Sequence, residues 1–521
     1  MTADTQAPSD IDVLIVGSGP VGATYARCIA EDAPDLAVLM VEAGPALTAP
    51  SGAHVRSIEN LEHQVRARML SQGPMIDVPP EHMAWPGMGA NVPRYRARPG
   101  TFLLVPEPDT EMPAAAMSAC VGGMGIHWTC AVPRPRGSEM APFIPTAEME
   151  QALQRAERLV GAKSDLFGRG SGGDPLLDAL ARTLNPDLPE GCGVRPMPMA
   201  GAIGPGGDVD WSSTATVLGP LATGPKAGFH LVADTVCMKI LMEGGEATGA
   251  VLRHRVTGEI RHVRARSVVV AADGLRTPQL LHASGIRSWA LGRHINDHTI
   301  VSATVRVHDS LVAAGQDTAA MPAASYDWLP GTRGAFWIPF ADTVHPFSGQ
   351  VMEYAVVEAD GRSDRRAGVT WYGTKDIRAD DRIVFSTDRT DYLGLPAMNV
   401  RYGYSNLDQA RIAQMHQWVD RTSQAIGTFI NGDGPQLRPA GTSLHYQGTV
   451  RMGAVDDGTS VCNSHARLWS ARNVFLGGNG VIPTATACNP TLTSMALAIR
   501  SASDVIEATR RAQADTRGAV A

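Results

Sequence analysis

Apolar runs define the first elements of the chain. Residues 12–16 form a short apolar run, which predicts a strand buried in a parallel sheet. A glycine-rich turn at 17–22 follows, and residues 23–30 have the composition of a helix. Residues 36–41 predict a second strand that ends at Glu42. This order of strand, turn, helix and strand indicates an α/β domain.

A less regular stretch comes next. Between residues 72 and 93, Gly, Pro, Met and Trp are mixed without a clear period, so we expect a long inserted loop. Loops of this length are often lids or disordered segments. Two interpretations stay open: a surface excursion without a role, or a gate over a binding site in which the methionines supply adaptable apolar contacts.

The second half of the chain returns to regular elements. Residues 229–266 contain several predicted strands, and 267–272 form a second fully apolar strand. Residues 300–440 alternate in a way that predicts a mostly antiparallel sheet with one face partly solvated. A helix is predicted over 492–512. Together these patterns predict an α/β fold that is an α+β composite, in which a parallel-sheet domain is joined to a mostly antiparallel sheet.

Composition limits the functional classes. The 521 residues carry a formal net charge of −7, which gives no reason to expect nucleic acid or a membrane as a partner. The 7 cysteines include no CxxC pair, so we expect reduced core thiols and no metal site. Residues 1–12 do not resemble a signal peptide, and no apolar run approaches the roughly 20 residues of a membrane span. We therefore expect a soluble, cytoplasmic protein.

The turn at 17–22 has the spacing of a dinucleotide site. Gly17 permits the tight turn, Gly19 lets the backbone approach a pyrophosphate, and Gly22 lets the helix and strand pack closely. Glu42, at the end of the next strand, would accept a hydrogen bond from the ribose. The alternative is a glycine turn without a ligand, but the flanking strand, helix and acid favour dinucleotide binding.

FAD is favoured over NAD at this turn. The motif lies near the N-terminus, and Glu42 continues into Ala43 and Gly44, a turn typical of flavoproteins. The strand at 267–272 leads into Asp273, as in a late segment of FAD domains that passes close to the cofactor. We therefore expect a Rossmann-like FAD-binding domain.

Five further segments carry motifs. Residues 444–453 read LHYQGTVRMG, 482–485 read IPTA and 489–493 read NPTLT. Together with 122–130 and 291–298, they resemble the glucose–methanol–choline (GMC) oxidoreductase family, and within it the pyranose oxidase branch. The chain looks most like the shorter bacterial members of that branch, which include glycoside 3-oxidases.

The resemblance implies a discontinuous domain organisation. Three segments would form the FAD-binding domain: 1–145 with the inserted loop at 72–93, 211–300 and 441–521. Residues 301–440 would form a substrate-binding domain on the mostly antiparallel sheet. Residues 146–210 would be an insertion of that domain or a linker.

The resemblance also implies FAD-dependent oxidation of an alcohol on a sugar. A base must then lie within hydrogen-bond reach of the hydroxyl. His445 matches the family's catalytic histidine, and Asn489 matches the paired asparagine, whose amide orients the hydroxyl. Without the motifs, His445 would be a core histidine and Asn489 a helix N-cap before Pro490. His298 is given no role on sequence grounds.

The expected contacts extend over several segments. Those to the cofactor are Gly17, Ser18, Gly19, Pro20, Val21, Gly22, Glu42, Ala43, Gly123, Met124, His127, Trp128, Thr129, Val236, Ala272, Gly478, Asn479, Gly480, Asn489, Pro490 and Thr491. Those to the substrate are Gln350, Tyr354, Thr129, His445 and Asn489. In many relatives the histidine at position 127 is bonded covalently to the flavin. Here Ile126 replaces the usual Thr before it, which favours a non-covalent contact.

Substrate and electron acceptor are less constrained. Residues 351–354 depart from the fungal pattern, which favours oxidation at C3 of a glycoside over C2 of a free pyranose. The flavin would be reoxidised by O2, giving H2O2, or by a quinone, as in a sugar dehydrogenase. An NAD(P)H-dependent flavin enzyme is disfavoured by the single dinucleotide fingerprint, and a non-enzymatic flavin sensor is the remaining alternative. We expect a monomer or a small homo-oligomer.

Overall fold

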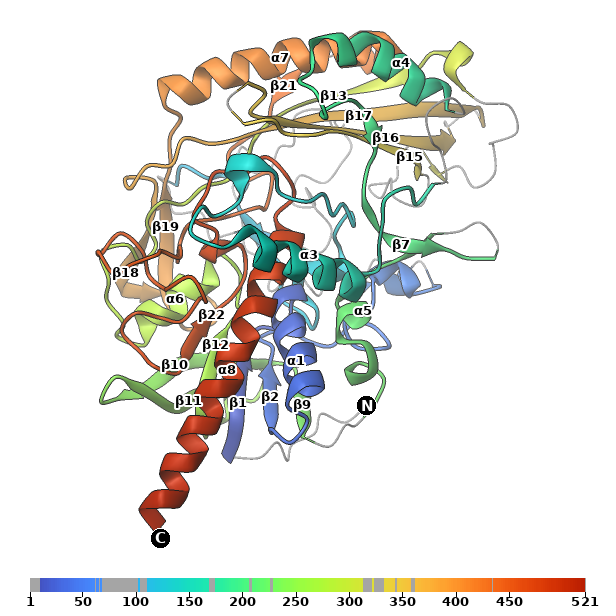
Figure 1. The fold of residues 1–521 in the computed structure, drawn as a ribbon. Helices are drawn as coiled ribbons and strands as arrows, with labels where there is room; N and C mark the ends of the chain where they lie inside the picture. Colours follow the sequence, from blue (N-terminus) through green and yellow to red (C-terminus); the bar gives the residue numbers. More distant parts are fainter. Residues whose placement is uncertain are drawn as a thin grey trace.

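Two packed layers make up the part of the chain that the structure describes. This computed structural model describes residues 10–60, 62–64, 66–67, 102–103, 110–167, 174–205, 209–224, 228–312, 321–322, 332–342, 344–357, 361–432 and 434–520. The predicted loop at 72–93, with its proposed gate, lies outside these residues. In Figure 1, one layer holds a parallel sheet beside a long C-terminal helix, and the other holds a sheet crossed by two helices.

The first layer is built on parallel strands. Neighbouring strands run in the order β9 (Phe229–Val232), β2 (Val38–Val41), β1 (Asp10–Val16), β12 (Ile260–Val270) and β22 (Val474–Leu476). Two antiparallel strands, β10 (Thr235–Glu243) and β11 (Glu246–His254), continue the sheet from the first half of β12. The predicted Rossmann-like architecture is therefore confirmed.

Three helices cover this sheet. They are α1 (Pro20–Asp32), α3 (Thr146–Val160) and α8 (Thr491–Val520), and both α1 and α3 pack against α8. The turn between β1 and α1 depends on glycine: Gly17 has φ +100°, and a Cβ atom there would lie 2.3 Å from the carbonyl oxygen of Ala271. A Cβ on Gly22 would lie 2.0 Å from the carbonyl oxygen of Gly17. The helix can start this close to the sheet only without those side chains.

The second layer is a mostly antiparallel sheet, as predicted. Its strands run in the order β20 (Gly427–Phe429), β13 (Thr299–Val307), β17 (Ser363–Gly373), β16 (Phe347–Val357), β15 (Thr332–Ile338) and β6 (Arg195–Pro196). On its outer face, apolar side chains such as Val369 and Trp371 pack with α7 (Asn406–Ile426) and α4 (Pro175–Leu184). Because side chains alternate along a strand, Thr370 and Tyr372 point to the opposite face.

Smaller elements connect the layers. They are β3 (Phe102–Leu103), β4 (Ala116–Met117), β5 (Ala162–Lys163), β7 (Met199–Ile203), β8 (Val209–Trp211), α5 (Thr214–Leu218), α6 (Arg276–Ala283), β14 (Met321–Pro322), β18 (Arg382–Thr390), β19 (Pro396–Arg401) and β21 (Gln436–Leu437). The segment 146–210 is divided between the layers, because α3 packs on α8 whereas α4 packs on α7. The strands β18 and β19 form a separate two-stranded sheet, and Arg382 at the start of β18 also bridges to Arg293.

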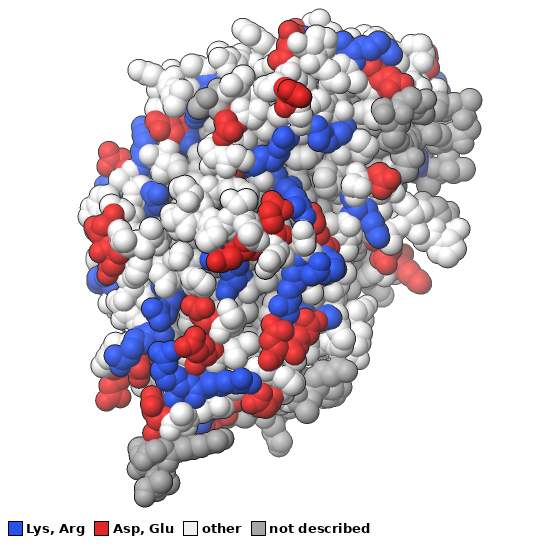
Figure 2. Space-filling model, in the orientation of Figure 1, with Lys and Arg blue, Asp and Glu red and all other residues white. Residues whose placement is uncertain are grey.

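Surface charge, cysteine burial and helix hydropathy can each be compared with what the composition predicts. On the face drawn in Figure 2, acidic and basic side chains are interspersed. All 7 cysteines are buried, which confirms their predicted place in the core. Within the described ranges, no helix is both long and apolar enough to cross a membrane.

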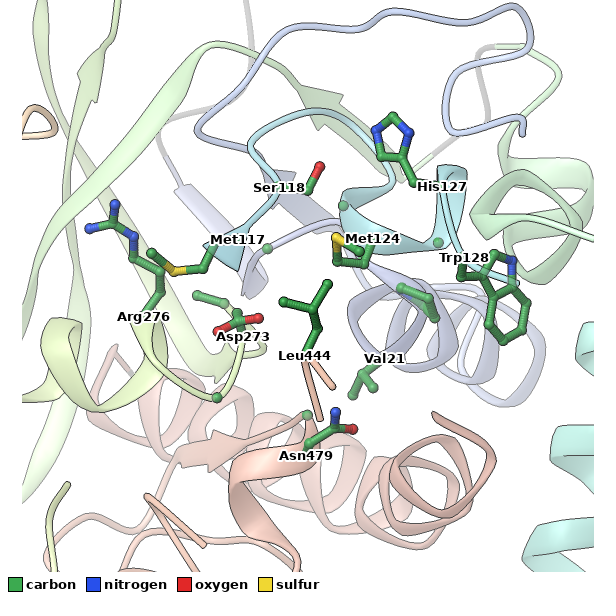
Figure 3. Close-up of a pocket in the computed structure, with 18 of the residues that line it drawn as sticks. Val21, Met117, Ser118, Met124, His127, Trp128, Asp273, Arg276, Leu444 and Asn479 are labelled. Atoms are coloured by element: carbon green, nitrogen blue, oxygen red, sulfur yellow. The ribbon is translucent and has the colours of Figure 1, made fainter. Parts of the chain in front are cut away.

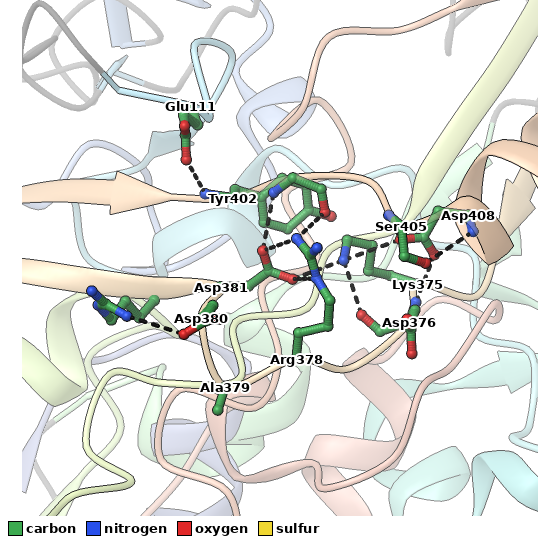
Figure 4. A network of polar contacts seen from close by, with 12 residues as sticks. Glu111, Lys375, Asp376, Arg378, Ala379, Asp380, Asp381, Tyr402, Ser405 and Asp408 are labelled. Atoms are coloured by element: carbon green, nitrogen blue, oxygen red, sulfur yellow. Dashed lines mark hydrogen bonds and ion pairs between the residues drawn. The ribbon is translucent and has the colours of Figure 1, made fainter.

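A buried ion network holds the start of α7 (Figure 4). Lys375 is fully buried, and its Nζ lies 2.8 Å from Oδ2 of Asp381 and 3.2 Å from Oδ2 of Asp408. Arg378 also donates to Asp381, so two cations face two carboxylates. Lys375 lies 5.0 Å from the ring centroid of Tyr402, whose hydroxyl donates to the backbone oxygen of Asp297.

Replacing Lys375 by Met should destabilise the fold. Arg378 stays with Asp381, but the change removes the cation that pairs with buried Asp408, and breaking a buried pair costs about 3–5 kcal/mol. Denaturant unfolding followed by circular dichroism would measure the loss. The matched control is Arg511→Met, because the Arg511–Glu507 pair is largely exposed and should contribute little. Equal unfolding midpoints for the two variants would contradict a structural role for this network.

Candidate active site

One cavity lies between the two layers. Its volume is about 570 Å³, and its lining runs from Gly17 and Gly19 to His445 and Asn489. The second sheet adds Ser302 to the wall. Figure 3 shows the middle of the cavity, where side chains from the N-terminal, central and C-terminal parts of the chain surround one space. Residues predicted to bind a cofactor and residues predicted to react with a substrate therefore share one chamber.

The glycine turn at one end of this cavity is open toward a ligand. A Cβ on Gly19 would meet no atom within 4 Å, and no side chain caps the helix that begins at Pro20. Exposed N–H groups at a helix start favour a phosphate. Glu42 is buried, and its Oε2 accepts hydrogen bonds from N and Oγ of Ser18, at 3.1 and 2.8 Å. Burial raises the pKa of Glu42, while these hydrogen bonds oppose the rise. The turn and its acid fit the pyrophosphate and ribose of a dinucleotide.

Most of the predicted cofactor residues line the cavity. They are Gly17, Ser18, Gly19, Pro20, Val21, Glu42, Ala43, Gly123, Met124, His127, Trp128, Thr129, Val236, Ala272, Gly478, Asn479, Asn489 and Thr491. Gly22, Gly480 and Pro490 lie outside the lining. Gly480 is instead packed against Thr449, since a Cβ there would lie 2.7 Å from Oγ1 of that residue.

Several lining residues were not predicted from the sequence. They include His54, Arg56, Met117, Ser118, Asp273, Arg276, Tyr372 and Tyr392. Asp273 has φ +84°, and burial raises the pKa of its carboxyl to about 6. Its position directly after the apolar strand 267–272 was the available signal, because ligands of parallel sheets bind at the carboxyl ends of the strands.

Asn489 is held by a residue of the second layer. Nε2 of Gln350 donates to Oδ1 of Asn489 at 2.6 Å, and both side chains are buried. Because the oxygen of this amide is engaged, its Nδ2 is the end that can donate to a substrate oxygen. Neither Gln350 nor Tyr354, both predicted as substrate contacts, is a lining residue: Gln350 reaches the cavity only through Asn489, and Tyr354 hydrogen-bonds to Thr304.

Two buried carboxylates fix the loops that carry His445 and Asn489. Asp297 accepts through Oδ1 from the backbone N of His445 at 3.1 Å and from Oγ of Ser443, and through Oδ2 from the backbone N of Gly441 at 3.1 Å. Oε1 of Glu139 accepts from the backbone N atoms of residues 487 and 488, at 2.7 and 2.9 Å. Each carboxylate is 1% exposed.

His298 lies against His445, although it was not among the predicted site residues. The Nδ1 atoms of the two rings are 3.1 Å apart, and the ring centroids are 4.9 Å apart. Tyr372 packs beside both rings, with centroids 5.7 Å from His298 and 6.1 Å from His445. Position 298 ends the motif at 291–298, but a motif match does not tell which of its side chains will touch the base.

Comparisons with known proteins identify the family. Residues 190–300 and 382–498 match models described as GMC oxidoreductase. A C-glycoside 3-oxidase of Microbacterium trichothecenolyticum is 41% identical over 516 residues, covering 96% of this chain and 97% of the relative.

The chain belongs to the GMC oxidoreductase family.

Other relatives agree with this assignment. A C-glycoside 3-oxidase of Arthrobacter globiformis is 39% identical and covers 96% of each chain. A pyranose 2-oxidase of Tricholoma matsutake is 29% identical, over 95% of this chain and 93% of that protein. The crystal structure of pyridoxine 4-oxidase from Mesorbium loti has a TM-score of 0.64 at 16% identity, covering 95% and 99% of the two chains, which shows a shared fold. GMC oxidoreductases are flavoproteins that act on CH–OH groups, so the predicted family and enzyme class are confirmed.

Asp297→Asn should slow this GMC oxidoreductase without emptying its cofactor site. An amide presents an N–H toward groups that themselves donate, so the backbone at His445 must shift. A misplacement of about 1 Å can cost roughly 10²-fold in rate. Turnover and bound flavin would be measured on the same preparation. The control is Asp380→Asn, since Asp380 is 92% exposed and pairs with Arg382 at 3.5 Å. Unchanged turnover in the Asp297 variant would contradict the anchoring role.

Proposed function

We propose that this protein is an FAD-dependent oxidase that converts the C3 hydroxyl of a glycoside to a ketone. Reoxidation by O2 would give H2O2. Two C-glycoside 3-oxidases at 41% and 39% identity support C3 over C2, because the pyranose 2-oxidase relative is 29% identical. The observation that carries the proposal is the single cavity that joins the dinucleotide turn to His445 and Asn489.

FAD, when bound, supplies the acceptor for the hydride that leaves the substrate carbon. The glycine turn and Glu42 would hold its pyrophosphate and ribose. His445 would take the hydroxyl proton at Nε2, because its Nδ1 faces His298. Asn489 would donate from Nδ2 to the substrate oxygen, in an orientation fixed by Gln350. The chain thus supplies a base and an orienting donor.

The inner face of the second sheet supports a sugar as the substrate. Gln350, Thr370 and Ser302 are paired across strands β16, β17 and β13, so they form one polar row. Thr370 and Ser302 line the cavity, and Nε of Arg438 donates to Oγ of Ser302 at 2.6 Å. Hydroxyl and amide groups both donate and accept, which suits the hydroxyls of a sugar ring.

Anaerobic addition of a C-glycoside should bleach the flavin absorbance of the purified protein. The sugar hydroxyl is the reductant, so no other electron donor is needed, and air should restore the colour with formation of H2O2. Glucose is the comparison substrate, and NMR of the product distinguishes a 3-keto from a 2-keto sugar. Bleaching by NAD(P)H alone would remove the sugar-oxidase proposal, and reoxidation by quinone but not by O2 would make the protein a dehydrogenase.

His445→Ala should lower kcat by roughly two to four orders of magnitude, the range for loss of a general base. Asn489→Ala should cost less, because it removes an orienting hydrogen bond and leaves the base in place. Stopped-flow flavin reduction would measure both rates. Each variant must retain flavin, since a loss of activity that follows a loss of flavin would indicate a structural role for the residue.

Acid denaturation should release the flavin into solution. His127 lines the cavity, but the residue before it is Ile126 and not the Thr that accompanies the covalent bond in related enzymes. After precipitation with trichloroacetic acid and centrifugation, yellow colour in the supernatant shows a non-covalent cofactor. Colour that stays with the pellet of the wild type, and is lost from the pellet of His127→Ala, would show a covalent bond to this histidine.

A further inference from the structure

His298 was not among the predicted site residues, yet its ring contacts that of His445. We propose that His298 is a positioning residue that keeps the proton of His445 on Nδ1 and thereby leaves Nε2 as the base; this inference rests on the proposed role of His445. Four side chains in contact with one another share the protons that decide this, and they are His445, His298, Thr486 and Gln447.

The contact between the two histidines requires one donor and one acceptor. Their Nδ1 atoms are 3.1 Å apart, so one nitrogen carries the hydrogen and the other offers a lone pair. If His298 donates, neutral His445 carries its own proton on Nε2 and cannot accept another there. If His445 donates, its Nε2 carries the lone pair. Only the second arrangement makes His445 a base toward the hydroxyl.

The far side of His298 accommodates this second arrangement. Its Nε2 lies 3.1 Å from Oγ1 of Thr486, which can accept a hydrogen bond from it. As placed, Nε2 of Gln447 lies 3.3 Å from the same nitrogen and donates to the same hydroxyl at 2.8 Å. The oxygen and nitrogen of an amide can exchange places by a turn of about 180°. With Oε1 turned toward His298, Gln447 accepts a hydrogen bond from Nε2 of His298. His298, Gln447 and Thr486 are all buried, so water does not compete for these positions.

His298 is suited to remain neutral while His445 changes charge. Burial lowers the pKa of His298 to about 3, so it does not take the proton itself. In the reaction the substrate O–H bond breaks and an N–H bond forms at Nε2 of His445. The resulting imidazolium still donates from Nδ1 to His298. A neutral acceptor at this position stabilises the imidazolium and raises the pKa of His445.

Charged and titratable groups from other elements also lie near His445. Oδ1 of Asp297 accepts from its backbone N, and Tyr372 packs beside its ring. Arg438 lines the same cavity but donates to Ser302. The buried Lys375 network reaches Asp297 through the hydroxyl of Tyr402. The test therefore alters His298 and leaves these groups in place.

The pH profile of kcat/KM with a C-glycoside tests the proposal. His298→Leu removes the acceptor, so the limb on which activity rises as His445 loses its proton should move to lower pH by about one unit. The plateau should fall by on the order of 10²-fold, the lower end of the effect of a general base. His298→Asn should restore most of both, because Oδ1 of asparagine takes the place of Nδ1. His416→Asn, on α7, is the matched control and should change neither.

Ring-¹⁵N histidine NMR gives a readout that does not depend on turnover. The signal lost in His445→Asn identifies His445, and it should show a proton on Nδ1 in the wild type and on Nε2, in part, in His298→Leu. Thr486→Val, which removes the acceptor for Nε2 of His298, should shift the signal in the same direction. A proton on Nε2 in the wild type, or a His298→Asn variant as impaired as His298→Leu, would overturn the proposal. If the protein oxidises no glycoside but the NMR signal of His445 is as expected, the proposed substrate is refuted and the proton assignment stands.

Discussion

The active site depends on hydrogen bonds that backbone N–H groups donate to two buried carboxylates. His445 and Asn489 lie on separate loops, and neither loop belongs to a regular helix or strand at those residues. Asp297 holds the first loop and Glu139 the second, each through more than one N–H. Burying a carboxylate costs several kcal/mol unless hydrogen bonds satisfy it. The two carboxylates are therefore most stable when both loops are in place, which couples the position of the reactive groups to folding.

The layered architecture explains why one chamber serves both the cofactor and the substrate. Parallel strands end at the glycine turn, and a ligand is expected at that edge of the sheet. The antiparallel sheet presents its apolar side chains to α7 and α4 and its polar ones to the chamber. Gln350 crosses from this sheet to Asn489. The hydrogen bond sets the orientation of the amide with respect to both layers.

The sequence predicted the parts of the molecule that follow local rules. The strand, glycine turn and helix at residues 10–32 were recognisable because Gly17 and Gly22 each satisfy a local steric constraint. The alternation in β17 likewise identified an antiparallel sheet with unlike faces. The roles of Asp297, Glu139 and His298 were not predictable, because their partners are 148, 349 and 147 positions away along the chain. A buried polar residue has the same local pattern whether it anchors a loop, touches a base or fills a core. Its role is decided by a distant segment.

The central sheet also constrains the order of events during synthesis. The hydroxyl of Tyr25, on α1, donates to the backbone oxygen of Leu476, 451 positions later, and β22 pairs with the end of β12. At a translation rate of about 5–20 residues per second, the N-terminal strands wait roughly 20–90 s before this last strand is made. After β12 ends at Val270, about 200 further residues must be made before β22 begins at Val474, which takes roughly 10–40 s at the same rate. During that time the edge of β12 beyond β11 has an unfilled row of hydrogen-bonding groups, the kind of edge that pairs with other chains. A truncated chain lacking β22 keeps this edge open and is therefore expected to aggregate.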